Sequence, residues 1–98
     1  MIKVVNIKTC KDWGKQGDVY IGRGSPWGNP YRMKNSTVVE RQRVIDLYEE
    51  KIIPKLDLEP LLKAKRLGCF CKPKLCHGDR LKELIDLKQE VRSVLFDE

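Results

Sequence analysis

Three of the four cysteines and the single histidine of this chain fall in one short segment, GCFCKPKLCHGD at 68–79. Cysteine and histidine are the side chains that bind zinc, provide nucleophilic thiolates and move protons. If the chain is extended up to Cys71, then Cys69 and Cys71 point to the same face, because side chains alternate along a strand. Cys76 and His77 stand where a helix is expected to begin, and a helix N-terminus favours a thiolate. The segment is therefore the first candidate for chemistry.

Three interpretations of this segment stay open. In the first it binds zinc, although its C-x-C-x4-C-H spacing differs from the usual C-x2-C pair. The four ligands would be Cys69, Cys71, Cys76 and His77, with Cys10 as a replacement. In the second, Cys76 is a catalytic nucleophile or redox thiol and His77 is its base. In the third, the cysteines are small apolar core residues and His77 caps the helix.

A second candidate segment is GRGSPWGNPY at 22–31. Its glycines free the backbone to approach a ligand, and successive exposed N–H groups can form an anion-binding nest. Arg23 offers a planar fork to a phosphate or carboxylate, whereas Trp27 and Tyr31 can stack on a nucleobase. A rigid turn whose tryptophan fills the core is the structural alternative. The residues expected to contact a ligand are Gly22, Arg23, Gly24, Ser25, Trp27, Gly28 and Asn29.

The elements around these segments decide where they lie. Runs of β-branched residues predict strands, and Thr37 followed by Glu40 predicts a capping box at the start of a helix that ends at Pro54. Residues 91–96 either prolong the last helix or form a strand. The expected elements are strands at 2–7, 19–23 and 66–71, a helix between Thr37 and Pro54, a short helix at 58–65, and a last helix from about His77.

This order of elements predicts the fold class. A chain of 98 residues makes one domain, residues 1–98. Strands that alternate with helices predict a small α/β sandwich with a short, at least partly parallel sheet flanked by helices. Ligands of such sheets bind beyond the carboxyl ends of the strands, and both candidate segments leave a strand there. We therefore expect the two segments to open on the same edge of the sheet.

Charge indicates the kind of partner. The helical blocks 40–59 and 79–98 carry eight basic and twelve acidic residues, a net charge of −4. The remaining residues, 1–39 and 60–78, carry twelve basic and two acidic residues, a net charge of +10. Positive charge on strands and loops favours an anionic partner such as a phosphorylated small molecule or a nucleic acid.

Compartment and membrane association are predicted from what the chain lacks. It has no apolar run of about 18 residues, and its first residues do not resemble a secretory signal. We therefore expect a cytoplasmic protein without a membrane partner. Disulfides are disfavoured in that compartment, which again points to metal or thiol chemistry for the cysteines.

The segments VYIGRGSPWGNPY at 19–31 and LGCFCKPKLCHGD at 67–79 resemble the two hallmark segments of the domain of unknown function 4326 family. Its members are small proteins of bacteria, archaea and their viruses. The resemblance implies no reaction, but it implies that both segments form one site. The residues that it joins are Gly22, Arg23, Gly24, Trp27, Gly28, Asn29 and Pro30 with Cys69, Cys71, Pro73, Cys76 and His77.

A looser resemblance links residues 67–79 to the domain of unknown function 488 family, whose members look Rossmann-like. It implies a Rossmann-like fold here too. In that family an arginine usually follows the Cys-His pair, whereas this chain has Gly78, so an anion-binding role at this position is not carried over.

Together these observations predict a protein that binds a phosphorylated ligand, a nucleotide or a nucleic acid, at a basic edge formed by residues 22–31 and 69–79. Cys76 and His77 would carry any nucleophilic or proton-transfer chemistry. The alternative is a non-enzymatic, zinc-stabilised module that binds nucleic acid or a protein. A third hypothesis is a viral or mobile-element protein whose loops only present an interaction surface.

Overall fold

The protein is built on a small parallel sheet, as the order of elements predicts. The computed structural model describes residues 2–72 and 74–96. Strands β1 (Lys3–Asn6), β2 (Asp18–Tyr20) and β3 (Arg66–Cys69) lie in the order β1-β3-β2, and β3 pairs in parallel with both neighbours. In this register Leu67 stands between Val4 and Val19. The carboxyl ends of all three strands therefore meet at one edge.

The first helical region changes its geometry before it ends. Helix α1 (Val38–Leu47) continues into a π-helical turn, η1 (Tyr48–Ile52), and a 3₁₀ turn, η2 (Ile53–Lys55). The proline in η2 has no backbone N–H and disfavours a regular α-helix at this point. The Thr37 hydroxyl accepts the predicted hydrogen bond from the Glu40 backbone N–H. Only this half of the capping box forms, because the Glu40 carboxylate instead accepts from the Lys34 N–H.

Two further helices complete the chain. The short helix α2 (Glu59–Leu62) comes before β3, and α3 (His77–Phe96) follows it. The predicted bounds of α2 were too wide by several residues. The open question about residues 91–96 is resolved, since α3 continues to Phe96.

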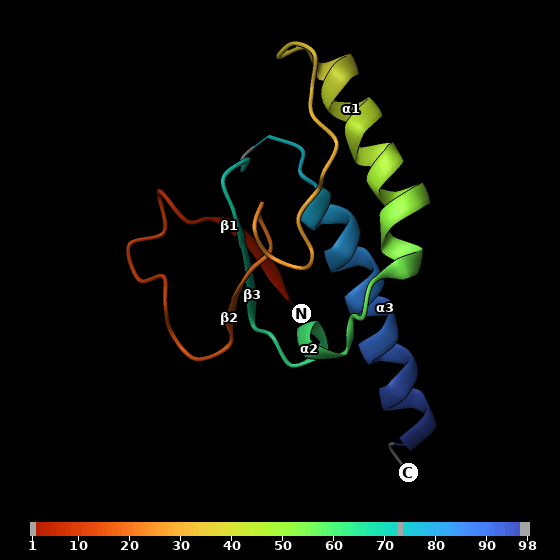
Figure 1. Ribbon diagram of the computed structural model, residues 1–98. Helices are drawn as coiled ribbons and strands as arrows, with labels where there is room; N and C mark the ends of the chain where they lie inside the picture. The colour runs from red at the N-terminus through yellow and green to blue at the C-terminus, as the bar shows by residue number, and fades with distance from the viewer. Residues whose placement is uncertain (1, 73, 97–98) are drawn as a thin grey trace.

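The two faces of the sheet are covered differently. Figure 1 shows α1 and α3 on one side of the sheet and the loop of residues 8–17 on the other. On the loop side, Trp13 packs so closely on Gly68 that a Cβ atom there would lie 2.4 Å from the indole. The expected sheet flanked by helices is therefore an α/β structure with a loop on its second face. The fully buried side chains between sheet and helices include Ile21, Tyr48, Leu61, Leu67, Leu81 and Ile85.

Within the described residues, none of the helices is both long enough and apolar enough to cross a membrane.

Candidate ligand-binding and cysteine site

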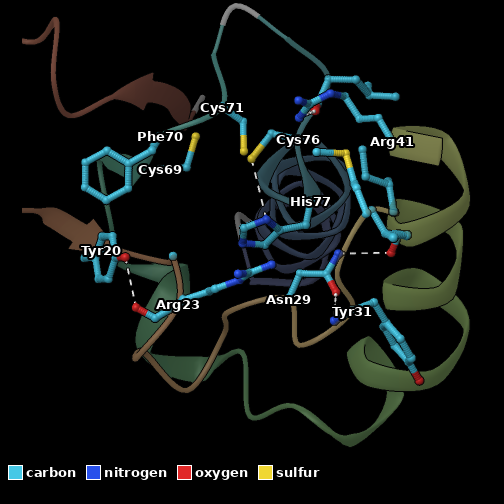
Figure 2. Close-up of a pocket in the computed structure, with 15 residues that line it drawn as sticks. Tyr20, Arg23, Asn29, Tyr31, Arg41, Cys69, Phe70, Cys71, Cys76 and His77 are labelled. Carbon is cyan, nitrogen blue, oxygen red and sulfur yellow. Dashed lines mark hydrogen bonds between the residues drawn. The ribbon is translucent and has the colours of Figure 1, made fainter. Parts of the chain in front are cut away.

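The two candidate segments converge at the carboxyl edge of the sheet. A cavity of about 260 Å³ lies there, and residues of both segments line it (Figure 2). The backbone explains the convergence, because β2 leads into residues 21–31 and β3 leads into residues 70–76 on the same edge. The sequence-predicted residues that line the cavity are Gly22, Arg23, Asn29, Tyr31, Cys69, Cys71, Cys76 and His77.

The remaining predicted ligand contacts lie elsewhere. Gly24, Ser25, Trp27 and Gly28 do not line this cavity. The Ser25 hydroxyl donates to the Gly22 carbonyl at 2.7 Å and so closes a turn. The indole N–H of Trp27 donates to the Asp57 carbonyl at 3.0 Å, and the ring packs against the core. This position fits the structural alternative, in which the tryptophan fills the core.

Asn29 is buried and connects the segment of residues 22–31 to helix α1. Its amide donates to the Val44 carbonyl at 3.0 Å, and its side-chain oxygen accepts from the Tyr31 N–H at 2.9 Å. Both polar atoms therefore have protein partners. Asn29 shapes the wall of the cavity and holds residues 29–31 against α1.

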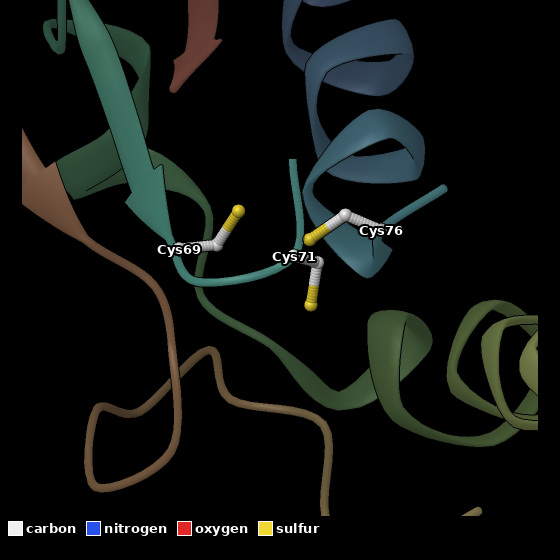
Figure 3. A group of neighbouring side chains, drawn as sticks. All are labelled: Cys69, Cys71 and Cys76. Atoms are coloured by element: carbon white, nitrogen blue, oxygen red, sulfur yellow. The ribbon is translucent and has the colours of Figure 1, made fainter. Parts of the chain in front are cut away.

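The three cysteines of the second segment form a sulfur cluster. The Sγ atoms of Cys69, Cys71 and Cys76 all lie within 4.8 Å of one another. Figure 3 shows that they come from the end of β3, the following loop and the start of α3. Cys69 and Cys76 are each 1% exposed, whereas Cys71 is half-buried. All four cysteines of the chain are free thiols.

Hydrogen bonds from outside the loop fix its shape. The side-chain amide of Asn6, at the end of β1, donates to the Lys72 carbonyl at 2.7 Å. The Asp79 carboxylate accepts from the Cys76 backbone N–H at 2.9 Å and pairs with the Lys72 ammonium. The carboxylate thus caps the first turn of α3 and ties it to the loop. Asn6 was missed from the sequence, because it carries no signal beyond its position at a strand end.

His77 is held beside Cys76 by a backbone carbonyl. Its Nε2 lies 2.7 Å from the Ile21 carbonyl oxygen, which can only accept, so Nε2 carries the proton. Burial lowers the pKa of the imidazole and keeps it neutral. Nδ1 then presents a lone pair to the Cys76 thiol, with 3.6 Å between Nδ1 and Sγ. The group of mutually close ligand atoms includes the three thiols and not His77, so the predicted four-ligand set is reduced to three.

The three thiols influence one another's ionisation. Hydrogen bonds from Cys71 and Cys76 lower the pKa of Cys69. The hydrogen bonds with Cys69 and Cys71, together with burial, raise the pKa of Cys76. Because neighbouring thiolates repel, the metal-free cluster favours a single thiolate, which accepts hydrogen bonds from the thiols that stay protonated. A bound cation would remove this restriction.

The cavity is basic. Arg23 and Arg41 line it, and no aspartate or glutamate is among the described residues of its lining. Arg41 donates to the Leu75 carbonyl at 3.2 Å, and within the described chain neither guanidinium has an ion-pair partner. Arg41 was missed from the sequence because it lies in the helical block 40–59, where acidic residues outnumber basic ones.

The rim of the cavity is aromatic and apolar. Phe70 is 51% exposed and packs edge-on against Tyr20, with 5.9 Å between ring centroids. Met33 and Leu75 are also exposed, and all four side chains line the cavity. Alternation along an extended strand would turn Phe70 away from Cys69 and Cys71, but β3 ends at Cys69 and all three residues line the cavity.

The fold and the site define a small α/β protein with a basic, sulfur-lined cavity at the carboxyl edge of a parallel sheet. The chain belongs to the family described as domain of unknown function (DUF4326), whose model matches residues 5–87. It is also similar to the "Uncharacterized 12.4 kDa protein in nrdA-td intergenic region" of Enterobacteria phage T4, with 40% identity over 77 residues. That match covers 70% of this chain and 68% of the phage protein. No solved structure matches the chain significantly.

Proposed function

We propose that this protein binds a small phosphorylated ligand, a mononucleotide, in the cavity between residues 22–31 and 69–77. The observation that carries the proposal is the pair of arginines, Arg23 and Arg41, on a cavity with no acidic side chain. A guanidinium recognises phosphate through a planar set of donors, and two of them can share the phosphate charge.

The rim supports a ligand that has a flat apolar part as well as a phosphate. Phe70 and Tyr20 offer aromatic surface, and aromatic side chains stack on nucleobases. Stacking is assigned to these two rings instead of Trp27, whose indole packs against the core. The volume of about 260 Å³ lies at the small end of ligand sites, which favours a mononucleotide over a dinucleotide.

The position of the cavity supports the same class of ligand. Ligands of parallel sheets gather beyond the carboxyl ends of the strands, and nucleotide-binding proteins with Rossmann-like sheets follow this rule. We extend the fold assignment to Rossmann-like on this basis. The reduced thiols fit a cytoplasmic protein, because disulfides form readily in oxidising compartments.

Calorimetric titration with adenosine 5′-monophosphate, in the presence of a chelator, tests the proposal. We expect Arg23→Gln and Arg41→Gln each to weaken binding by about 10- to 100-fold, the usual size of a lost charged hydrogen bond. Arg32→Gln is the matched control, since Arg32 is exposed, does not line the cavity and has no ion-pair partner among the described residues. The affinity of Arg32→Gln for adenosine 5′-monophosphate should equal that of the wild type.

Two further ligands separate the phosphate from the base. Adenosine should bind weakly, because it cannot engage the arginines, and ribose 5-phosphate should keep a dependence on Arg23. Equal affinity for the nucleotide in the wild type and in both cavity variants would overturn the proposal. So would a single-stranded oligonucleotide that binds with a steep salt dependence while the mononucleotide does not, since this result indicates a nucleic-acid partner.

A further inference from the structure

The sulfur cluster is more than a mononucleotide site requires, because phosphate and base recognition use none of the three thiols. We infer that Cys69, Cys71 and Cys76 bind one thiophilic divalent cation of the zinc type, with a fourth coordination position that opens into the cavity. This inference does not depend on the proposed nucleotide. It also differs from the zinc set expected from the sequence, because His77 is not a ligand.

The separations of the sulfur atoms fit such an ion. Zinc–sulfur bonds of about 2.3 Å in a tetrahedron place the sulfurs about 3.8 Å apart. The three Sγ atoms already lie within 4.8 Å of one another, so contraction by about 1 Å or less completes the geometry. Cys71 is half-buried and lies on the loop outside β3 and α3, so its side chain has the most room of the three to adjust.

The surroundings of the thiols suit metal-bound sulfur. The Gly78 backbone N–H donates to Cys76 Sγ at 3.4 Å, and the helix N-terminus stabilises negative charge there. The hydrogen bonds of Asn6 and Asp79 fix the loop before any ion arrives, which lowers the entropy cost of binding. Such outer contacts orient the ligands of a metal site.

Burial favours a metal ligand over an attacking thiol. Cys76 is 1% exposed, and Cys69 and Cys71 stand beside its sulfur, where a substrate would need to approach. A buried thiolate can still coordinate an ion. Cys69 and Cys71 also have no role in a simple Cys76–His77 pair, whereas a metal uses all three sulfurs.

The fourth position falls on the cavity side. The hydrogen bond to the Ile21 carbonyl holds the His77 ring, and its nitrogens lie outside the group of mutually close donors. All three cysteines line the cavity, so water or a donor atom of a ligand can complete the coordination. Three thiolates around one divalent ion leave a site of charge −1, beside a cavity that Arg23 and Arg41 line.

Titration of reduced, chelator-stripped protein with Co²⁺ and Zn²⁺ tests the inference, with a non-thiol reductant present. We expect one Co²⁺ per chain, with the intense visible absorption of tetrahedral cobalt–thiolate coordination, and displacement by one equivalent of Zn²⁺. Cys71→Ser should weaken binding by about 100-fold or more, because loss of a ligand costs at least as much as loss of its supporting contacts. Cys10→Ser is the matched control and should leave the titration unchanged, since Cys10 lies outside the cluster.

Cys71→Ser is preferred to changes at the two fully buried cysteines because the half-buried side chain tolerates the substitution. Circular dichroism of the variant should match that of the wild type. Binding of clearly less than one Co²⁺ per chain, or a spectrum typical of octahedral cobalt, would overturn the inference. So would equal cobalt affinity in Cys71→Ser and the wild type. Nucleotide titration of the metal-free protein separates this result from the proposed function, since either can fail alone.

Discussion

The two ends of strand β3 carry the same types of side chain in opposite arrangements. At its amino end, Arg66 and Cys10 meet two aspartates, whereas at its carboxyl end Arg23, Arg41 and three cysteines line a cavity whose described lining residues include no aspartate or glutamate. Both ends hold arginine and thiol groups. They differ in whether the protein itself supplies the partner of the positive charge.

At the amino end the charge of Arg66 has carboxylate partners within the protein. Arg66 donates to both carboxylate oxygens of Asp18, each at 2.7 Å, and to Asp12 at 2.9 Å. The Asp18 side chain is 3% exposed, and the guanidinium also lies over the Trp13 ring, 5.8 Å from its centroid. Arg66 thereby ties the loop of residues 8–17 to the sheet. This arrangement stabilises the fold and leaves nothing for a ligand.

At the carboxyl end the two arginines have no ion-pair partner among the described residues. The Arg41 guanidinium donates to the Leu75 backbone carbonyl. The Tyr20 hydroxyl donates to the backbone carbonyl of Arg23 and does not engage the Arg23 guanidinium. The comparison teaches that partners distinguish structural arginines from binding arginines better than net charge does. The excess of positive charge in the sequence counted both kinds together.

The largest expected effect on stability comes from substitution of Arg66. We expect Arg66→Gln to lower the melting temperature by roughly 10 °C, because it leaves the buried Asp18 carboxylate without its cation. Arg66→Lys should fall between this variant and the wild type, since lysine keeps the charge but loses the two-pronged contact. Thermal unfolding followed by circular dichroism measures both. An unchanged melting temperature for Arg66→Gln would contradict the structural role assigned to the amino end of β3.

Acid tests the structural role of Asp18 at the amino end. Hydrogen bonds from Arg66 lower the pKa of Asp18 to about 2, from an ordinary value of 3.8. Because the folded pKa lies below the unfolded one, the contribution of Asp18 to stability is complete above about pH 4 and is lost as the pH falls towards 2. Denaturant unfolding at several pH values should show the stability difference between wild type and Asp18→Asn shrinking over this range. A constant difference would contradict the assignment.

A smaller effect is expected where the sheet supports the cysteine loop. Asn6→Ala removes the hydrogen bond to the Lys72 carbonyl and should cost about 1 kcal/mol of stability. It should also weaken Co²⁺ binding by about tenfold, because the loop is no longer fixed. Asn35→Ala is a suitable control, since Asn35 hydrogen bonds only within its own turn beside α1. Equal cobalt affinity in Asn6→Ala and wild type would show that the loop needs no support.

Local sequence signals predicted the framework and the meeting of the two segments. Runs of β-branched residues, the Thr37 cap and the leucine pattern of α3 act within a few residues, and parallel strands follow from their order. The site in detail depends on contacts distant in sequence. Trp27 and Arg23 look equally suited to a ligand in the chain, but only the packed structure turns the indole to the core. Arg41 lines the cavity from helix α1, and the residues around it in the sequence look like those of an ordinary solvent-exposed helix face.

The account rests on where the ligand binds along β3, and a two-dimensional ¹H–¹⁵N spectrum recorded during titration with adenosine 5′-monophosphate measures this directly. The account predicts shifts of the backbone amides of Gly22, Arg23 and residues 69–72 and 74–77, with the amides of residues 10–18 unchanged. Shifts centred on residues 10–18, or no shifts at saturating nucleotide, would contradict it.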